Sequence, residues 1–597
     1  MELPTRMIDV GIIGSGCNDY VRLVESSSLP HSPRVTYVAL SYCWGIGQSV
    51  TTVSTNYEAM KQGIHIAELP PTIQDAITVT RNLGQRYLWI DALCIIQDSS
   101  TDWELESARM ASVYQNAYIT VAAGTAAAAS EGFLGSRRHL ASRSKNEYHV
   151  EWEAGVNSDD PSSSQPRKTI LAARVIPYST FHYSHMVADG LPLNTRGWTM
   201  QEKILSRRVI TYTTHELQWT CQSLNNCECG YLADSSKDVD TITVNPALTH
   251  QEAFYEWAKI VKKYSSRSLT YHQDKLPAIS GVAHAFQNMI FQSSSSSSPY
   301  LGGHWVNNFP EELAWKAMPP PSHSSSDPNP NVADNDNDSE HYIAPTFCWP
   351  SIPAGGSIEC VYLQHQHHRT FRPCSVVTGF GSEVQGENPL GRITANSGWL
   401  SLRGHVVKAQ LTIKEFLGFY TVEQVVLLSK KKGLGKAHMF ADMHLEEFEA
   451  EVLSSSSESE DDGFGGGGGE RKGWVKEKSV RRSHIPLPGP QSGKGIDCAV
   501  YLFLLGYWVE TRVNKGGANS ETGGEGVQEE TELDSQPIFA FLVLGRSPTQ
   551  PEKFERIGFS LSFAQIEGAS KLEERELVRA ETLKGLFGED LREVTIV

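Results

Sequence analysis

The sequence predicts an α/β domain at the N-terminus, in which helices flank a parallel sheet with added hairpins. A helical segment and a mostly β C-terminal region are expected to follow. Strand-like and helix-like runs alternate between residues 37 and 123, which is typical of parallel strands joined by right-handed crossovers. Residues 252–290 carry apolar side chains at helical spacing. Beyond residue 341, short runs rich in β-branched and aromatic residues follow one another.

The composition excludes several classes of protein. The chain has 597 residues, of which 40% are hydrophobic and 20% are charged, so it can bury a large core. Its net charge of -17 argues against nucleic-acid binding, which requires a basic surface, and against docking on anionic lipid. We find no apolar run of the roughly 18 residues that a membrane span requires and no secretion signal. Ten cysteines in such a chain indicate reduced thiols and a cytoplasmic location.

The first elements are predicted as follows. Residues 7–10 and 20–25 are expected to be strands joined by a turn, and residues 37–42 a buried strand. Thr72 is expected to cap a helix that stops at Gly84, because glycine supplies the left-handed conformation in which many helices end.

The next elements complete the alternation. Residues 87–90 form a short predicted strand that ends at Asp91, and residues 118–123 form another. Between them, Thr101 and Glu104 have the spacing of a capping box for a second helix. The inner face of that helix is expected to contain Leu105, Ala108, Val113 and Ala117. Ligands bind at the carboxyl ends of parallel strands, and five residues lie at or just past such ends: Ser41, Tyr42, Trp44, Asp91 and Cys94.

The remaining chain is predicted in four parts. Residues 194–202 lead into a helix, and residues 208–213 and 216–221 form a hairpin that closes a domain spanning 1–245. Helices at 252–265 and 275–290 make a helical extension over 246–318. A polar linker at 319–340 is expected to be disordered. The mostly β region at 341–597 has disordered insertions at 454–470 and 514–536 and a closing helix at 572–587.

Three separated blocks of the sequence resemble the signature blocks of the fungal heterokaryon incompatibility (HET) domain. They are YVALSYCWG at 37–45, RYLWIDALCIIQD at 86–98 with DWELE at 102–106, and NTRGWTMQE at 194–202. The resemblance implies an effector of non-self recognition, innate immunity and programmed cell death. It also implies a TIR-like or flavodoxin-like core, because HET domains are remotely similar to TIR domains. Enzymatic TIR domains cleave NAD at the nicotinamide–ribose bond with a glutamate on a helix.

The resemblance implies Glu106 as the catalytic acid, since Trp103 and Glu106 are similar to the Trp-then-Glu pattern of TIR domains. A carboxylate beside the ribose could stabilise an oxocarbenium-like state. Alternatively, Glu106 is an acid favoured in a first helical turn by the helix dipole. Asp91 is the second catalytic candidate, or else a turn cap. We expect Ser41, Asp91 and Glu106 to converge at one end of the sheet.

Six residues are candidates for binding a nucleotide: Ser41, Tyr42, Trp44, Gly45, Arg196 and Trp198. Trp44 could stack on an adenine or nicotinamide ring, or could fill the core. Arg196 could bind a phosphate, or could pair with an acid of the first two blocks. In either case the third block is expected to pack against the first two.

The sequence gives no firm indication of a cofactor, and NAD enters as a candidate substrate. Cys94 is expected to be an inert buried thiol. His215, Cys221, Cys227 and Cys229 lack the close cysteine pairs of structural zinc sites, so we expect no metal there. The expected partners are proteins, either an incompatibility partner or a second copy. NAD hydrolysis and a non-enzymatic module that oligomerises and recruits death machinery remain alternative mechanisms.

Overall fold

The computed structural model divides the chain into two compact units, Met1–Val244 and Asn245–Val597. The residues that the structure describes are 2–12, 19–29, 35–45, 50–135, 147–153, 168–174, 191–213, 216–221, 223–228, 248–291, 299–318, 342–352, 356–364, 369–386, 388–416, 419–427, 438–441, 444–454, 473–483, 496–513, 530–532, 537–547, 549–550, 552–563 and 591–597.

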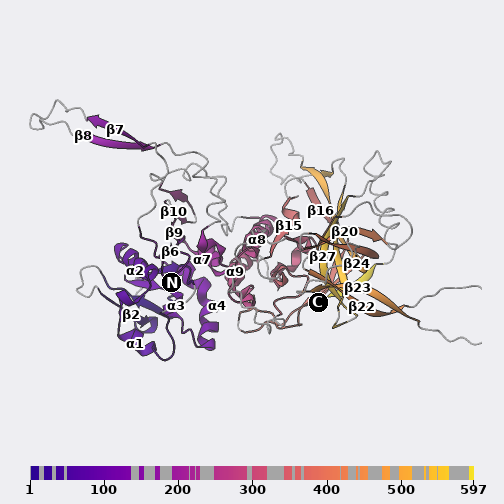
Figure 1. The fold of residues 1–597 in the computed structure, drawn as a ribbon, viewed down its shortest axis with the longest axis horizontal. Coiled ribbons are helices and arrows are strands. Elements are labelled where there is room, and N and C mark those ends of the chain that lie inside the picture. The colour runs from indigo at the N-terminus through magenta and orange to yellow at the C-terminus, as the bar shows by residue number, and fades with distance from the viewer. Residues whose placement is uncertain are drawn as a thin grey trace, which may run out of the picture. The chain divides into compact units, whose positions relative to one another are not determined.

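The N-terminal unit is built around a mixed, nine-stranded sheet with helices around it (Figure 1). The strand order is β11-β10-β9-β6-β3-β5-β1-β2-β4. Its strands are β1 (Arg6–Asp9), β2 (Tyr20–Glu25), β3 (Tyr37–Ser41), β4 (Ile64–His65), β5 (Tyr87–Trp89), β6 (Ile119–Ala122), β9 (Arg208–Tyr212), β10 (Leu217–Cys221) and β11 (Asn225–Cys227). A separate antiparallel pair consists of β7 (Glu147–Glu153) and β8 (Lys168–Arg174).

The centre of this sheet is parallel, as the alternation of strands and helices predicts. β3 pairs in parallel with β5 on one side and with β6 on the other, and β6 pairs in parallel with β9. The β1–β2 and β9–β10 hairpins are antiparallel, as expected. The sheet as a whole is therefore mixed rather than parallel, because the hairpins extend it at both edges.

Five helices accompany the described part of this sheet: α1 (Tyr57–Gln62), α2 (Pro71–Asn82), α3 (Asp91–Cys94), α4 (Ser100–Asn116) and α7 (Trp198–Leu205). The central strands are mostly apolar: β3 and β6 are fully buried, and Tyr87 is the one partly exposed residue of β5. This burial on both faces is what a parallel sheet covered by helices requires.

The predicted start of α2 is wrong. Pro71 occupies the first helical position, where its missing N–H costs nothing, and Thr72 lies inside the helix. The Thr72 hydroxyl instead accepts a hydrogen bond from the Gly132 backbone N–H over 3.2 Å. The predicted stop is correct, since Gly84 follows the helix with φ 69°.

The predicted start of α4 is also wrong, by two residues. Ser99 caps the helix by accepting from the Asp102 backbone N–H over 3.3 Å, while Thr101 is exposed in the first turn. Leu105 is 55% exposed rather than part of the inner face. The buried residues of α4 are Glu106, Met110, Val113 and Tyr114.

The C-terminal unit contains the two predicted helices, α8 (His250–Ser265) and α9 (Pro277–Phe291), and is otherwise mostly β. Its strands are β12 (Tyr300–Leu301), β13 (His304–Trp305), β14 (Trp315–Met318), β15 (Ser357–Cys360), β16 (Arg369–Pro373), β17 (Val376–Gly381), β18 (Trp399–Gly404), β19 (Val406–Phe416), β20 (Phe419–Leu427), β21 (His438–Ala441), β22 (His444–Ser454), β23 (Gly473–Ser483), β24 (Ile496–Val513), β25 (Glu530–Glu532), β26 (Ile538–Arg546), β27 (Phe554–Phe563) and β28 (Arg592–Ile596). Thirteen of these strands are linked into one sheet.

Buried polar contacts tie the small β14–β15 pair to this sheet. Arg556 of β27 is fully buried and donates hydrogen bonds to the backbone carbonyls of Leu313 and Trp315. Its guanidinium also lies 3.4 Å from the centre of the Trp315 ring, a cation–π contact.

Some predicted segments lie outside the described residues. They are the linker at 319–340, the closing helix at 572–587 and most of the insertions at 454–470 and 514–536, in which Ser454 and β25 are described. Within the described parts of the chain, no helix is both long and apolar enough to cross a membrane.

Candidate functional site

The first signature block forms β3 and the turn that follows it. Residues 41–43 are buried, Trp44 is half-buried and Gly45 is exposed. Gly45 has φ 76°, and a β-carbon at this position would lie 2.3 Å from the β-carbon of Ala128. The glycine is therefore required by its backbone conformation and by close packing.

Asp91 follows β5 and accepts hydrogen bonds at the same edge of the sheet. The Trp44 indole N–H donates to its Oδ2 over 2.9 Å, and the Ala92 backbone N–H donates to its Oδ1 over 2.7 Å. Burial raises the pKa of Asp91, whereas Arg196, Trp44 and Tyr42 act in the opposite direction. The first two blocks thus meet where adjacent parallel strands end.

Arg196 connects the third block to the first. It follows a 3-10 turn (Pro192–Thr195), and its Nη1 donates to the backbone carbonyl of Tyr42 over 2.7 Å. Its positive charge lowers the pKa values of Asp91 and Glu202. Arg196 is half-buried, so its guanidinium neutralises part of the negative charge at this edge.

Trp198 makes a second connection. Its ring meets that of Trp103 on α4 edge to face, with 6.5 Å between the ring centres, and it packs against the core of the unit. The predicted packing of the third block against the first two is therefore confirmed.

Glu202 of α7 is an acid with a strongly altered environment. It is 5% exposed, and burial together with the charge of Asp91 raises its pKa to about 7. A hydrogen bond from Ser41, the charge of Arg196 and the neighbouring Tyr114 hydroxyl, whose proton is donated to the Leu40 backbone carbonyl over 3.0 Å, limit this rise. A carboxyl group with a pKa near neutrality can both accept and release a proton.

Reasoning from the sequence placed Glu202 in the third block but did not name it as a site residue, and it missed Tyr114. A signal for Glu202 was present, because it lies four residues after Trp198 and so shares its face of the helix. Tyr114 gave no such signal, since it lies outside the three blocks.

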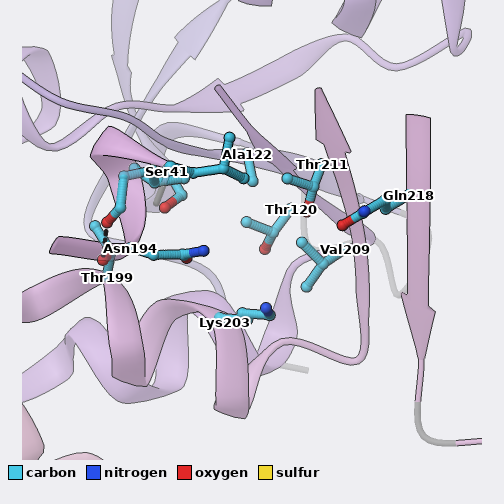
Figure 2. A pocket seen from close by; sticks show the side chains of 11 residues that line it. Ser41, Thr120, Ala122, Asn194, Thr199, Lys203, Val209, Thr211 and Gln218 are labelled. Carbon is cyan, nitrogen blue, oxygen red and sulfur yellow. Dashed lines mark hydrogen bonds between the residues drawn. The ribbon is translucent and has the colours of Figure 1, made fainter. Parts of the chain in front are cut away.

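A small cavity adjoins Ser41, between the sheet and α7 (Figure 2). Its volume is about 20 Å³. It is lined by Ser41, Thr120, Ala122, Leu191, Leu193, Asn194, Thr199, Lys203, Val209, Thr211 and Gln218. Most of these side chains are polar, and one is a lysine.

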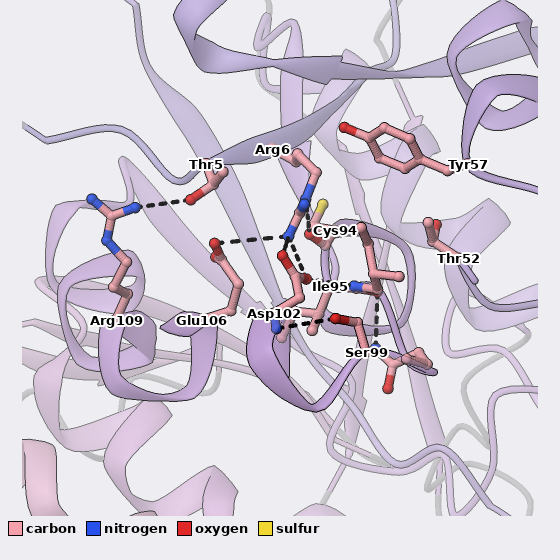
Figure 3. A network of polar contacts seen from close by, with 12 residues as sticks. Thr5, Arg6, Thr52, Tyr57, Cys94, Ile95, Ser99, Asp102, Glu106 and Arg109 are labelled. Carbon is pink, nitrogen blue, oxygen red and sulfur yellow. Dashed lines mark hydrogen bonds and ion pairs between the residues drawn. The ribbon is translucent and has the colours of Figure 1, made fainter. Parts of the chain in front are cut away.

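Glu106 lies in a different network, centred on Arg6 (Figure 3). It is 1% exposed, and its Oε1 lies 3.7 Å from Arg6 Nη2. The same nitrogen donates to both carboxylate oxygens of Asp102, over 2.7 and 2.6 Å. Burial raises the pKa of Glu106, while Thr5 and Arg6 oppose the rise. The catalytic role of Glu106 stays a prediction. The helix-dipole alternative is wrong, because α4 begins at Ser100 and Asp102 is the acid of its first turn; the contact with Arg6 gives Glu106 a different structural role.

The cysteines show no activated thiol at this edge. Burial raises the pKa of Cys94 to about 12, and burial also raises that of Cys43. Cys221 and Cys227 are described, but His215 and Cys229 lie outside the described residues. Where the structure describes the chain, no group of three His, Cys, Asp or Glu side chains could hold a metal ion.

The arrangement at the ends of β3 and β5 can support acid–base chemistry. Asp91 is surrounded by hydrogen-bond donors, while Glu202 has a pKa of about 7 and can exchange a proton near neutral pH. Trp44 and Arg196 are half-buried beside them and offer an aromatic face and a positive charge.

A comparison with protein families identifies the N-terminal unit. Residues 37–202 match the family described as heterokaryon incompatibility protein (HET). Comparisons with curated proteins and with solved structures find no match. The matched range starts at β3 and ends at Glu202, so it contains all three signature blocks and the two acids. The chain therefore contains a heterokaryon incompatibility (HET) domain at residues 37–202.

Proposed function

We propose that this protein is a cytoplasmic effector of fungal non-self recognition and programmed cell death, and that its HET domain hydrolyses NAD at the nicotinamide–ribose bond. The observation that supports the enzymatic part is the charge interaction between Asp91, which follows β5, and the buried Glu202 of α7, which contributes to the raised pKa of Glu202. The two carboxyl groups differ in environment, which is how acid and base roles are separated in many enzymes.

The proposed reaction uses the two acids differently. The Asp91 carboxylate, which accepts hydrogen bonds from Trp44 and Ala92, stabilises the positive charge that develops on the ribose as nicotinamide leaves with the bonding electrons. Glu202 removes a proton from the water whose oxygen forms the new bond to the ribose. Trp44 offers a face on which a ring could stack, and Arg196 offers a charge for a phosphate.

The finer fold assignment is part of this proposal. A TIR-like or flavodoxin-like core is supported by the parallel order β5-β3-β6, in which the chain leaves β3 first to one side and later returns to the other. In open α/β sheets a ligand binds at such a reversal of strand order.

The test is to incubate the full-length protein with NAD and to measure free nicotinamide by chromatography. Asp91→Asn and Glu202→Gln should each reduce its release by about 10²-fold or more. Glu104→Gln, an exposed acid on α4, is the matched control and should leave the rate unchanged. A wild-type protein that releases no nicotinamide would refute the enzymatic proposal.

The alternative is a non-enzymatic module that self-associates and recruits death machinery. This alternative is favoured by the burial of Glu106 in an ion pair. Glu106 is the acid that the TIR resemblance implies as catalytic, and at 1% exposure it is not accessible to a substrate. The two functions separate in a fungal host: if Asp91→Asn and Glu202→Gln still kill at equal protein levels, the module acts without hydrolysis.

A further inference from the structure

We propose that the cavity between the sheet and α7 binds neighbouring hydroxyl groups of a sugar. The identification of this sugar as the ribose that carries nicotinamide rests on the proposed NAD hydrolysis. The binding chemistry itself follows from the size of the cavity and from the direction of its hydrogen bonds.

The volume limits what can enter. About 20 Å³ accommodates one or two water-sized groups, because a single water requires roughly 10–15 Å³ on this measure. A nucleobase or an intact sugar ring does not fit, whereas two neighbouring hydroxyl groups of a sugar do.

Two of the lining hydroxyls already donate their protons elsewhere. Thr199 Oγ1 donates to the backbone carbonyl of Leu193 over 2.6 Å and lies 2.9 Å from that of Arg196. Ser41 donates to the carboxylate of Glu202, an interaction that lowers the pKa of that acid. Each hydroxyl has one proton, so both oxygens present lone pairs to any further neighbour.

Thr120 Oγ1 also presents lone pairs to the cavity, because two successive hydrogen bonds take up its proton. Ser206 Oγ donates its proton to the backbone carbonyl of Glu202. The 2.6 Å contact between Thr120 Oγ1 and Ser206 Oγ must then use the proton of Thr120. A third lining oxygen is thus an acceptor, and a ligand beside these three oxygens needs protons to donate.

The nitrogen-bearing side chains of the cavity require a ligand that can also accept hydrogen bonds. Asn194, Lys203 and Gln218 lie on three sides of Thr120 (Figure 2), and all three can donate. A sugar hydroxyl satisfies both demands, because it donates one proton and accepts others. The dianion of a phosphate ester would be attracted by Lys203 but has no proton for the three lone pairs.

The cavity is coupled to the proposed reaction through Ser41. This residue lines the cavity and also donates to Glu202, so a sugar held by its hydroxyls lies one side chain away from the acid with a pKa of about 7. The cavity would therefore select ribose over sugars that lack the adjacent pair of hydroxyls.

The test compares ADP-ribose with ADP, which differ by the terminal ribose, in calorimetric titrations of the full-length protein. ADP-ribose should bind about tenfold more tightly than ADP. Added inorganic phosphate should not reduce this difference in affinity. Lys203→Met keeps an unbranched side chain that is one atom shorter and removes the ammonium, so it should reduce the affinity for ADP-ribose to that for ADP. Thr120→Val, which removes one acceptor, should act in the same direction. Lys61→Met, a lysine that pairs with Glu25 and does not line the cavity, is the control.

The outcomes distinguish this inference from the proposed function. Equal affinities for ADP and ADP-ribose would overturn the assignment of the cavity to the ribose that carries nicotinamide, even if the protein hydrolyses NAD. An equal loss of both affinities in Lys203→Met would overturn it in favour of a phosphate site. A preference for ADP-ribose without nicotinamide release would support the inference and refute the hydrolysis. The thermal unfolding midpoint of each variant shows whether its fold is retained.

Discussion

Glu106 and Glu202 are both buried acids of the N-terminal unit, and their neighbours give them different chemistry. Glu106 faces Arg6, which already binds Asp102 through short hydrogen bonds. Glu202 faces Asp91 and two hydroxyl groups, so its proton is held with a pKa of about 7. An acid in an ion pair mainly holds elements together, whereas an acid beside another acid is suited to proton transfer.

This difference predicts how two matched substitutions act. Glu106→Gln should leave nicotinamide release within a few-fold of wild type, because it changes a contact between β1 and α4 rather than the proposed site. Glu202→Gln should reduce release by about 10²-fold or more. The opposite result, with Glu106→Gln inactive and Glu202→Gln active, would establish the assignment expected from the TIR resemblance.

At the level of elements, the start of α4 depends on a single cap. Ser99 accepts a hydrogen bond from the backbone of Asp102, while Thr101 lies exposed two residues later. Ser99→Ala should therefore lower the free energy of unfolding by about 1 kcal/mol. Chemical denaturation provides the measurement, and Thr101→Ala is the control with little expected effect. A larger loss for Thr101→Ala would show that the helix begins where the capping-box pattern placed it.

The contact between β1 and α4 is the second element-level prediction. Arg6 is buried and pairs with Asp102 and Glu106, and its Nε donates to the backbone carbonyl of Cys94 over 2.7 Å. Arg6→Met leaves two acids without their partner and should cost about 3–5 kcal/mol of stability. Arg109→Met breaks an exposed pair with Glu2 and should cost at most about 1 kcal/mol. Equal losses in denaturant titrations would contradict the importance of burial here.

At the scale of the whole molecule, each unit contains a buried acid that should make stability depend on pH. Burial raises the pKa of Glu202 in the first unit and of Glu311 in the second to about 7, from an ordinary value of 4.5. Folding therefore favours the protonated acid. The stabilisation is complete below pH 4.5 and is lost as pH rises to about 7. For Glu202 the change in the free energy of unfolding is about 3 kcal/mol. The side chain of Glu311 is more exposed to solvent than that of Glu202, so Glu311 should contribute less.

Unfolding titrations between pH 4.5 and 7 test this dependence. Glu202→Gln should reduce the slope of the free energy of unfolding against pH. A second substitution, Glu311→Gln, should reduce this slope by a smaller amount. Glu104→Gln changes the charge equally but alters an exposed acid, so its slope should match that of wild type. A slope unchanged by Glu202→Gln would mean that this carboxyl titrates normally in the folded protein.

Most elements of the described chain could be predicted because local patterns specify them. Apolar runs such as 37–42 and 87–90 became β3 and β5, and the helical periodicity at 252–265 became α8. Helix starts were less predictable. Thr72 and Thr101 had suitable side chains, but a proline and an earlier serine provided better first positions.

The HET domain, the parallel centre of the first sheet and the packing of the third signature block against the first two could be predicted before the fold was known, because each depends on periodicity or on rare residues in a fixed order. Which acids share an environment became clear only from the fold. Glu202 lies within reach of the charge of Asp91, whereas Glu106 pairs with Arg6. The fold also directs the protons of Ser41, Thr120 and Thr199 away from the cavity. The pKa of an acid and the direction of a hydroxyl proton are set by neighbours distant in the chain, and no local pattern of residues records them.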